Sequence, residues 1–239
     1  MARIDKLTSF DVVGELARAL PDVDCFHLLD VPSPPEFQKR VEHLADFQES
    51  IHAGVDLRDR FGISFWDGLL AYACSTPKAS LLAAFNAALL HDPSKSRLRQ
   101  RRSSQLSEQE LTTIMASLPL GRMLAISSLV LLKNGERKHI PMIDFRCRVT
   151  ETNLDVVKAA LQALQTGPGT ILDSGASFHF VGTSLISESE LFAFLARGVL
   201  LSPVVDRRWA AHQIIESACA LRIGISPRYS SLPSVVARV

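Results

Sequence analysis

The stretch ILDSGASFHFVG, residues 171–182, predicts a hairpin of two β-strands joined by a tight turn. The polar run Asp-Ser-Gly at 173–175 supplies the bend. On the second strand, Ser177 and His179 are two residues apart, so their side chains point to one face of a sheet and the neighbouring phenylalanines to the other. A hydroxyl beside an imidazole, next to a glycine turn, suits binding of a phosphate or another anion. A half-buried hairpin with one satisfied histidine is the plainer interpretation, and it stays open.

Composition places the chain among globular proteins. It has 239 residues, of which 47% are hydrophobic, enough for one large domain or two small ones. A net charge of +1 gives no overall field that attracts nucleic acid, so any basic binding surface must be local. We expect no secretory signal and no transmembrane helix, because charges occur early and no run of about 20 apolar residues exists. These features favour a cytoplasmic protein with no membrane partner.

Residues 1–120 are expected to form a mostly helical region. Apolar residues recur there at helical spacing in four segments, 9–20, 35–52, 64–73 and 77–91. The aromatic residues Phe65, Trp66 and Phe85 are compatible with the partner surface of a helical interaction protein. Burial in a core is the more common fate of such residues.

A dense basic cluster lies within the polar segment 92–106. It consists of Lys95, Arg97, Arg99, Arg101 and Arg102. Such runs commonly form solvated, mobile loops. In an otherwise neutral chain, the same cluster also suits a loop that contacts the phosphates of a nucleic acid or a nucleoside triphosphate. The sequence favours neither interpretation over the other.

Residues 121–239 are expected to alternate between β-hairpins and helices. Asn134-Gly135 separates two extended runs, and this dipeptide is the strongest short-range hairpin signal. Helices are expected over 152–166, 187–197 and 207–219, followed by a short strand in ALRIGIS, 220–226. The predicted fold class is α+β, with a helical N-terminal half and a second half of antiparallel hairpins and helices. The two regions are also compatible with one compact unit.

Charged side chains on the strands form a candidate reaction centre. Asp144 lies on the strand IPMIDFRC, and Asp206 ends the apolar run LLSPVVD. Carboxylates on neighbouring strands suit Mg²⁺ or Mn²⁺, which prefer oxygen ligands and activate a hydroxyl beside a phosphoryl group. His179 and Arg222 then suit a triphosphate. Plainer interpretations stay open: Asp144 pairs with Arg146, Asp206 caps the next helix and Arg222 pairs with a carboxylate.

In this order, the segments resemble the archaeo-eukaryotic primase superfamily, the primase-polymerases, and most nearly small bacterial members described as primase 1D-like. The family carries an acidic motif on one strand, a Ser-x-His motif on a glycine-preceded hairpin and a hydrophobic-Asp motif. The matching residues are Asp144 in IDFR, Ser177-Phe178-His179 in SGASFHFVG, Val205-Asp206 in VVDRRW and Arg222 in ALRIGISPRY. The resemblance covers roughly residues 120–230. One position departs, because Arg146 stands where the family's Asp-x-Asp motif has its second carboxylate.

The resemblance implies a nucleotidyltransferase that acts on nucleotides with a nucleic-acid template or primer. The implied catalytic residues are Asp144, Asp206 and His179, the metal ligands for Mg or Mn are Asp144 and Asp206, and the nucleotide-binding residues are Ser177, His179, Arg222 and Arg146. The basic cluster would contact DNA or RNA. A helicase or other protein partner, and a role in DNA replication or defence, are further expectations.

The alternative is a catalytically degenerate module of the same fold that binds nucleotide or nucleic acid within a larger assembly. Arg146 favours this alternative, because a cation there repels a second metal ion and attracts phosphate.

Overall fold

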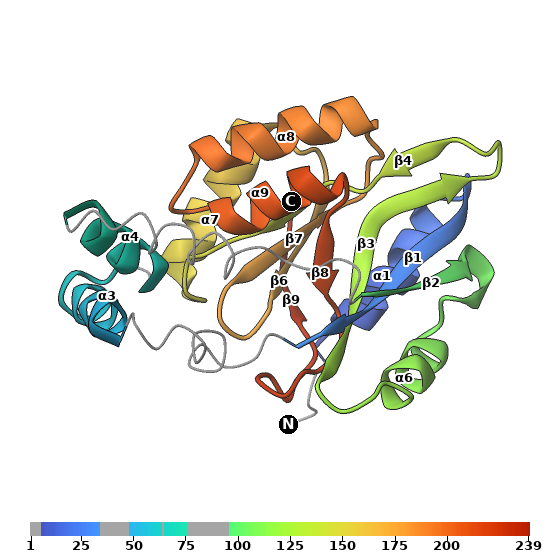
Figure 1. The fold of residues 1–239 in the computed structure, drawn as a ribbon. Coiled ribbons are helices and arrows are strands. Elements are labelled where there is room, and N and C mark those ends of the chain that lie inside the picture. The colour runs from blue at the N-terminus through green and yellow to red at the C-terminus, as the bar shows by residue number, and fades with distance from the viewer. Residues whose placement is uncertain (1–5, 34–47, 64, 76–95) are drawn as a thin grey trace, which may run out of the picture. The chain divides into compact units, whose positions relative to one another are not determined.

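The computed structural model describes residues 6–33, 48–63, 65–75 and 96–239 (Figure 1). Contacts divide the chain into two compact units, Met1–Ser33 with Asp92–Val239, and Pro34–His91. This division differs from the boundary expected near residue 120. The reason is that a strand following the first helix pairs with a strand of the second half and so joins the two.

The smaller unit contains two described helices, α3 (Gln48–Phe61) and α4 (Phe65–Ser75). They pack closely where glycines meet, since a Cβ atom on Gly68 would lie 2.7 Å from the carbonyl oxygen of Gly54. The expected helix 77–91, with Phe85, lies outside the described residues, as does most of the expected helix 35–52.

A five-stranded antiparallel sheet forms one part of the larger unit, in the order β2-β1-β3-β4, with β8 also paired to β3. Its strands are β1 (Val23–Pro32), β2 (Arg97–Arg102), β3 (Arg122–Leu132), β4 (Arg137–His139) and β8 (Ala220–Arg222). The expected Asn134-Gly135 hairpin is confirmed: it joins β3 to β4, and Gly135 has a φ of 84°. Helices α1 (Ser9–Ala19) and α6 (Glu108–Ala116) contribute to the same core.

A second antiparallel sheet has the order β5-β7-β6-β9. Its strands are β5 (Met142–Asp144), β6 (Gly169–Asp173), β7 (Phe178–Gly182) and β9 (Ser234–Arg238). The ILDSGASFHFVG hairpin is confirmed as β6 and β7, in which Asp173 lies opposite Phe178. Phe178 and Phe180 are buried in the core, as the alternation of side chains predicts.

Helices α7 (Glu151–Leu164), α8 (Glu188–Leu200) and α9 (Arg207–Glu216) gather on one side of the second sheet (Figure 1). Strand β8 of the first sheet lies beside the second sheet and contacts β5. Each helix begins after a polar residue whose side chain accepts a hydrogen bond from a backbone N–H of the first turn; these residues are Thr150, Ser187 and Asp206, respectively. The cap at Ser187 is reciprocal, because Glu190 accepts a bond from its backbone N–H at 2.7 Å.

The fold is α+β, as the sequence predicts, and its two sheets exclude an all-helical interaction protein. Three strands were not expected: β1, β2 and β9. Among the described residues, no helix combines the length and apolar character needed to cross a bilayer.

Candidate active site

Pairing of β5 with β7 places Asp144 directly opposite His179. The Nε2 atom of His179 lies 3.6 Å from Asp144 Oδ1, and the Ser177 hydroxyl donates a long hydrogen bond of 3.5 Å to the same oxygen. Ser177 and His179 therefore share one face, as their spacing predicts, and that face meets the acidic strand.

Polar groups of the chain itself hold the turn between β6 and β7. The backbone N–H and the hydroxyl of Ser174 both donate to the Ser177 carbonyl at 2.9 Å. The N–H of Gly175 donates to Asp173 Oδ1 at 2.7 Å. Gly175 has a φ of 98°, and a Cβ atom there would lie 2.8 Å from Cδ1 of Tyr229. The turn therefore requires glycine for its backbone and for its contact with an aromatic ring.

Arg222 reaches this turn from β8, which belongs to the other sheet. Its guanidinium donates to the carbonyl of Ser174 and, at 2.6 Å, to the carbonyl of Gly224. The same guanidinium lies over the ring of Tyr229, with 4.8 Å between Cζ and the ring centroid. The guanidinium also donates to the Ser231 carbonyl at 3.4 Å, so three backbone carbonyls and one aromatic face fix Arg222.

Tyr229 is a part of the site that sequence reasoning missed. It lies in the segment after β8, where the pattern SPRYS carries only turn signals. Its ring packs on Gly175 and is also approached by Arg228, whose Cζ lies 5.4 Å from the ring centroid. Only the folded chain brings Gly175 and Tyr229 together.

Asp206 is brought beside Asp144 by the backbone. Phe145 forms an isolated antiparallel bridge with Val205, and the Asp206 N–H donates to the Asp144 carbonyl at 3.0 Å. The two acidic residues expected to act together therefore lie on adjacent stretches of extended chain.

The carboxylate of Asp206 also caps α9. Its Oδ1 atom accepts hydrogen bonds from the backbone N–H groups of Arg208 at 2.9 Å and Trp209 at 3.1 Å. The Trp209 indole in turn donates to the Ala220 carbonyl at 3.0 Å, which ties α9 to the start of β8. The cap interpretation of Asp206 is confirmed, while its role as a metal ligand stays a prediction.

The pKa values of Asp144 and His179 are shifted in opposite directions, and each shift favours the neutral form. Burial and the nearby charge of Asp206 raise the pKa of Asp144 well above its usual value, against the opposing influence of Ser177 and Arg222. Burial and the charge of Arg222 lower the pKa of His179 to about 3. His179 is therefore a neutral imidazole at neutral pH, and its contact with Asp144 is not an ion pair. Within the described part of the chain, its buried Nδ1 atom has no hydrogen-bond partner.

Arg146 follows the bridge, and its N–H donates to the Val204 carbonyl at 2.8 Å. The charges that most affect the pKa of Asp144 are those of Asp206 and Arg222 rather than of Arg146. Among the described residues, no group of three or more His, Cys, Asp or Glu side chains could hold a metal ion by itself.

A comparison with models of known protein families identifies the family to which this chain belongs. The profile of the family described as "Archaeo-eukaryotic primase 1D-like" matches residues 102–233, more than half of the 239-residue chain. The chain belongs to this family. In the same comparisons, no curated protein and no solved structure matches it.

The primase-like region contains every residue of the site described above. Within residues 102–233 lie Asp144, Ser177, His179, Asp206, Arg222 and Tyr229. Strand β1 and helix α1 lie outside it, although they complete the first sheet and its core. The catalytic, nucleotide-binding and metal-binding roles expected of these residues stay predictions.

The basic cluster is an edge strand rather than the expected loop. Residues Arg97–Arg102 form β2, which pairs with β1 through six registered residues, and this pairing removes the freedom of a loop. Lys95 lies outside the described residues. Arg99 approaches the buried carboxylate of Asp30 at 3.8 Å, and Arg101 pairs with Glu110 at 3.2 Å. The cluster is therefore not a single free surface, and its role in nucleic-acid binding stays a prediction.

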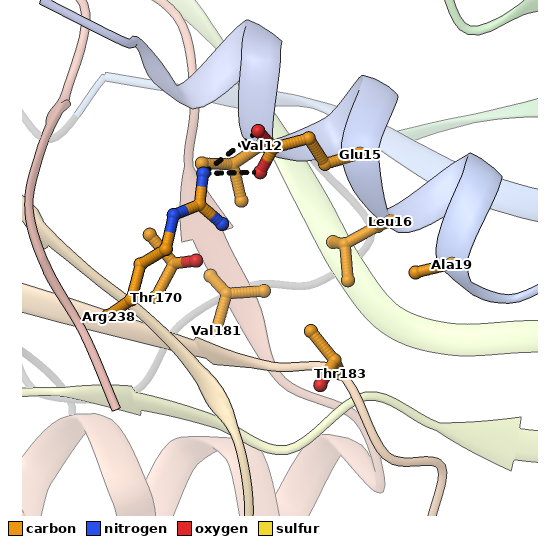
Figure 2. Close-up of a pocket in the computed structure, with 8 residues that line it drawn as sticks. All are labelled: Val12, Glu15, Leu16, Ala19, Thr170, Val181, Thr183 and Arg238. Carbon is orange, nitrogen blue, oxygen red and sulfur yellow. Dashed lines mark hydrogen bonds and ion pairs between the residues drawn. The ribbon is translucent and has the colours of Figure 1, made fainter.

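A small pocket of about 200 Å³ lies between α1 and the second sheet (Figure 2). Val12, Leu16 and Ala19 line it from the helix, Thr170 and Val181 from the strands, and Thr183 from just after β7. Glu15 and Arg238 pair across its edge at 2.8 Å. None of its lining residues belongs to the candidate active site, so we assign it no part in the chemistry.

Proposed function

We propose that this chain is a nucleotidyltransferase of the primase-polymerase type, which extends a nucleic-acid strand from nucleoside triphosphates. The observation that carries the proposal is the meeting of three motifs at one point. The pairing of β5 with β7 sets Asp144 against Ser177 and His179, and the Phe145–Val205 bridge brings Asp206 alongside. Membership of the primase 1D-like family supports the same reaction class.

Asp144 and Asp206 are the residues that would hold a Mg²⁺ or Mn²⁺ ion. Magnesium in proteins is commonly bound by one or two carboxylates together with substrate phosphates and waters, so a two-carboxylate site fits it. The charge of Asp206 raises the pKa of Asp144, and a cation between them would offset this repulsion. When bound, such an ion neutralises charge on a phosphoryl group and favours ionisation of an attacking hydroxyl.

The remaining residues would bind and orient the triphosphate. Arg222 supplies a fixed positive charge, because the Ser174 and Gly224 carbonyls and the Tyr229 ring hold its guanidinium in place. His179 remains neutral at neutral pH, so one of its ring nitrogens can donate a hydrogen bond to a phosphate oxygen. Ser177 donates to Asp144 and so orients that carboxyl group.

A non-catalytic module that binds nucleotide or nucleic acid is the second candidate. The observation that favours it is Arg146, which stands in place of a second carboxylate on the acidic strand. With fewer carboxylates, a site retains phosphate binding through Arg222 and His179 more readily than metal-dependent chemistry.

Nucleotide incorporation into primed and unprimed single strands, with Mg²⁺ or Mn²⁺, tests the proposal. The variants are Asp144→Asn and, as a matched control, Asp155→Asn, whose carboxylate is exposed on α7. We expect the wild type and the control to form product and Asp144→Asn to lose at least about 100-fold in rate, the scale of an essential electrostatic group. Equal activity of Asp144→Asn would sink the proposal. Triphosphate binding without product from any template would support the second candidate.

A further inference from the structure

The two faces of the five-stranded sheet differ. One face packs on the core and includes the completely buried side chains of Phe26, Leu28, Leu124, Ile126 and Val130. The other, here called the outer face, carries Leu98, Gln100 and Arg102 of β2, Cys25, His27 and Leu29 of β1, Ala125 and Leu131 of β3, Arg137 of β4 and Arg222 of β8. Leu98 is 56% exposed, and Leu29 and Leu131 remain partly exposed. The outer face is therefore accessible in part and has an apolar floor.

Strand register places two arginines in one row across this face. Arg102 pairs with Cys25, Cys25 with Leu131, and Leu131 with Arg137, so the row crosses four strands and ends in a guanidinium on each side. With strands about 4.8 Å apart, the row is roughly 14 Å long. The carboxylate of Asp24 also lies at this row, where it accepts a hydrogen bond from the Cys25 thiol at 3.4 Å.

The pKa shifts of two residues on the outer face support the placement of the Arg102 and Arg137 guanidiniums near it. Burial raises the pKa of Cys25, and the charge of Arg102 opposes that shift. Burial lowers the pKa of His27, and the charge of Arg137 lowers it further. Each arginine thus acts on a residue of the outer face.

A second row connects the outer face to the candidate active site. Leu98 pairs with Leu29, Leu29 with Ala125, and Ala125 with Arg222. Arg222 is the residue that reaches the turn beside Ser177 and His179. The outer face is thus continuous, strand by strand, with the site proposed for triphosphate binding.

The other arginines of β2 occupy the opposite face. Arg99 and Arg101 pair in register with Leu28 and Phe26, and they approach Asp30 and Glu110. By contrast, neither Arg102 nor Arg137 forms an ion pair with any residue in the described part of the chain.

We propose that the outer face is the docking surface for a single-stranded nucleic acid, whose phosphates bind Arg102 and Arg137 and whose path leads to Arg222. Charge complementarity and continuity with the candidate active site carry this assignment. The floor formed by Leu29, Leu98 and Leu131 accommodates the bases without hydrogen-bond readout, so binding depends on salt more than on sequence. The inference rests on the proposed function, because the bound strand is the template or primer of that reaction.

Fluorescence anisotropy of a labelled dT 20-mer with the full chain, over a range of salt concentrations, tests the surface. The double variant Arg102→Gln/Arg137→Gln is expected to reduce the log-log salt slope by about 1.4, since each phosphate contact on single strands contributes about 0.7. Arg197→Gln is the matched control, because Arg197 is an exposed arginine on α8, outside the five-stranded sheet. It should leave the slope unchanged. Leu98→Glu should weaken binding as well.

Equal slopes for the double variant and the wild type, or an equal reduction by Arg197→Gln, would overturn the inference. Absence of binding by the wild type would overturn it as well. Binding of magnesium triphosphate, measured separately in the double variant, distinguishes this failure from failure of the proposed function. Intact triphosphate binding with an unchanged salt slope would remove the docking surface and leave the candidate active site standing.

Discussion

Replacement of Gly175 tests whether Tyr229 holds Arg222 in place. Gly175 has a φ of 98°, and a Cβ atom there would lie 2.8 Å from Tyr229 Cδ1, closer than real Cβ contacts. Gly175→Ala must therefore strain the backbone and displace the ring. The matched control is Gly135→Ala in the β3–β4 turn, where φ is 84° and nothing lies within 4 Å of the added atom.

The expected losses of stability follow from the strained backbone and from the displaced Tyr229 ring. Positive φ costs a residue with a Cβ atom about 1–2 kcal/mol, and both variants should lose this much free energy of unfolding in urea titrations. Gly175→Ala should lose about 0.5–1 kcal/mol more, the strength of an exposed cation–π contact, because Tyr229 leaves the Arg222 guanidinium. The same loss should weaken magnesium triphosphate binding about two- to fivefold.

A double-mutant cycle isolates the ring. In a Tyr229→Leu background, Gly175→Ala should cost no more than Gly135→Ala, because the aromatic contact is already absent. If Gly175→Ala and Gly135→Ala lose the same stability and bind triphosphate equally well in the wild-type background, Tyr229 does not hold Arg222 in place.

Three further predictions concern buried charge, capping and pH. Asp30→Asn should lower the free energy of unfolding in urea titrations by about 3–5 kcal/mol, because it removes the buried carboxylate that pairs with the largely buried guanidinium of Arg122. A change of no more than a few tenths of a kcal/mol would contradict this expectation. Ser187→Ala should lower the free energy of unfolding by about 1 kcal/mol and Tm by about 2–4 °C, because α8 loses its N-cap. An unchanged Tm would mean that this cap does not stabilise the protein. The folded-state pKa of His179, about 3, lies below its value of 6.5 in the unfolded chain, so protons bind the unfolded state first and stability is lost as pH falls below 6.5. Between pH 7.5 and 5 the free energy of unfolding should fall by about 2 kcal/mol more in the wild type than in His179→Gln. Equal decreases would mean that the His179 side chain is solvated in the folded protein.

The sequence predicts well those elements whose signals are local. The Asn134-Gly135 turn, the Ser187 cap and the Asp173–Gly175 bend each depend on residues within a few positions, and all three occur as expected. The same holds for the shared face of Ser177 and His179, because alternation along a strand is a local property.

Strand β2 shows why the rest could not be predicted. Its sequence RLRQRR has almost no apolar residues and signals a solvated loop. It forms a strand because β1 offers a complementary edge, and because the buried Asp30 and the partly exposed Glu110 compensate Arg99 and Arg101. These partners lie on other elements, so local propensity was overridden by tertiary context.

The candidate site also combines residues that the sequence predicts with contacts that it does not predict. Sequence motifs identify Asp144, His179 and Asp206, but nothing in the sequence indicates that Tyr229 packs on Gly175 or that Arg222 reaches Ser174. Such contacts depend on how the two sheets meet, which no short-range pattern specifies.

Calorimetric titration of magnesium triphosphate into the wild type, Asp144→Asn and the Asp155→Asn control tests whether Asp144 belongs to the nucleotide site. We expect the wild type and the control to bind and Asp144→Asn to bind at least about tenfold more weakly, a loss of about 1.4 kcal/mol of binding free energy. The Asp144→Asn protein should stay folded, because burial and the charge of Asp206 already disfavour ionisation of Asp144. Equal affinity in all three proteins would contradict the account, since Asp144 would then lie outside the nucleotide site.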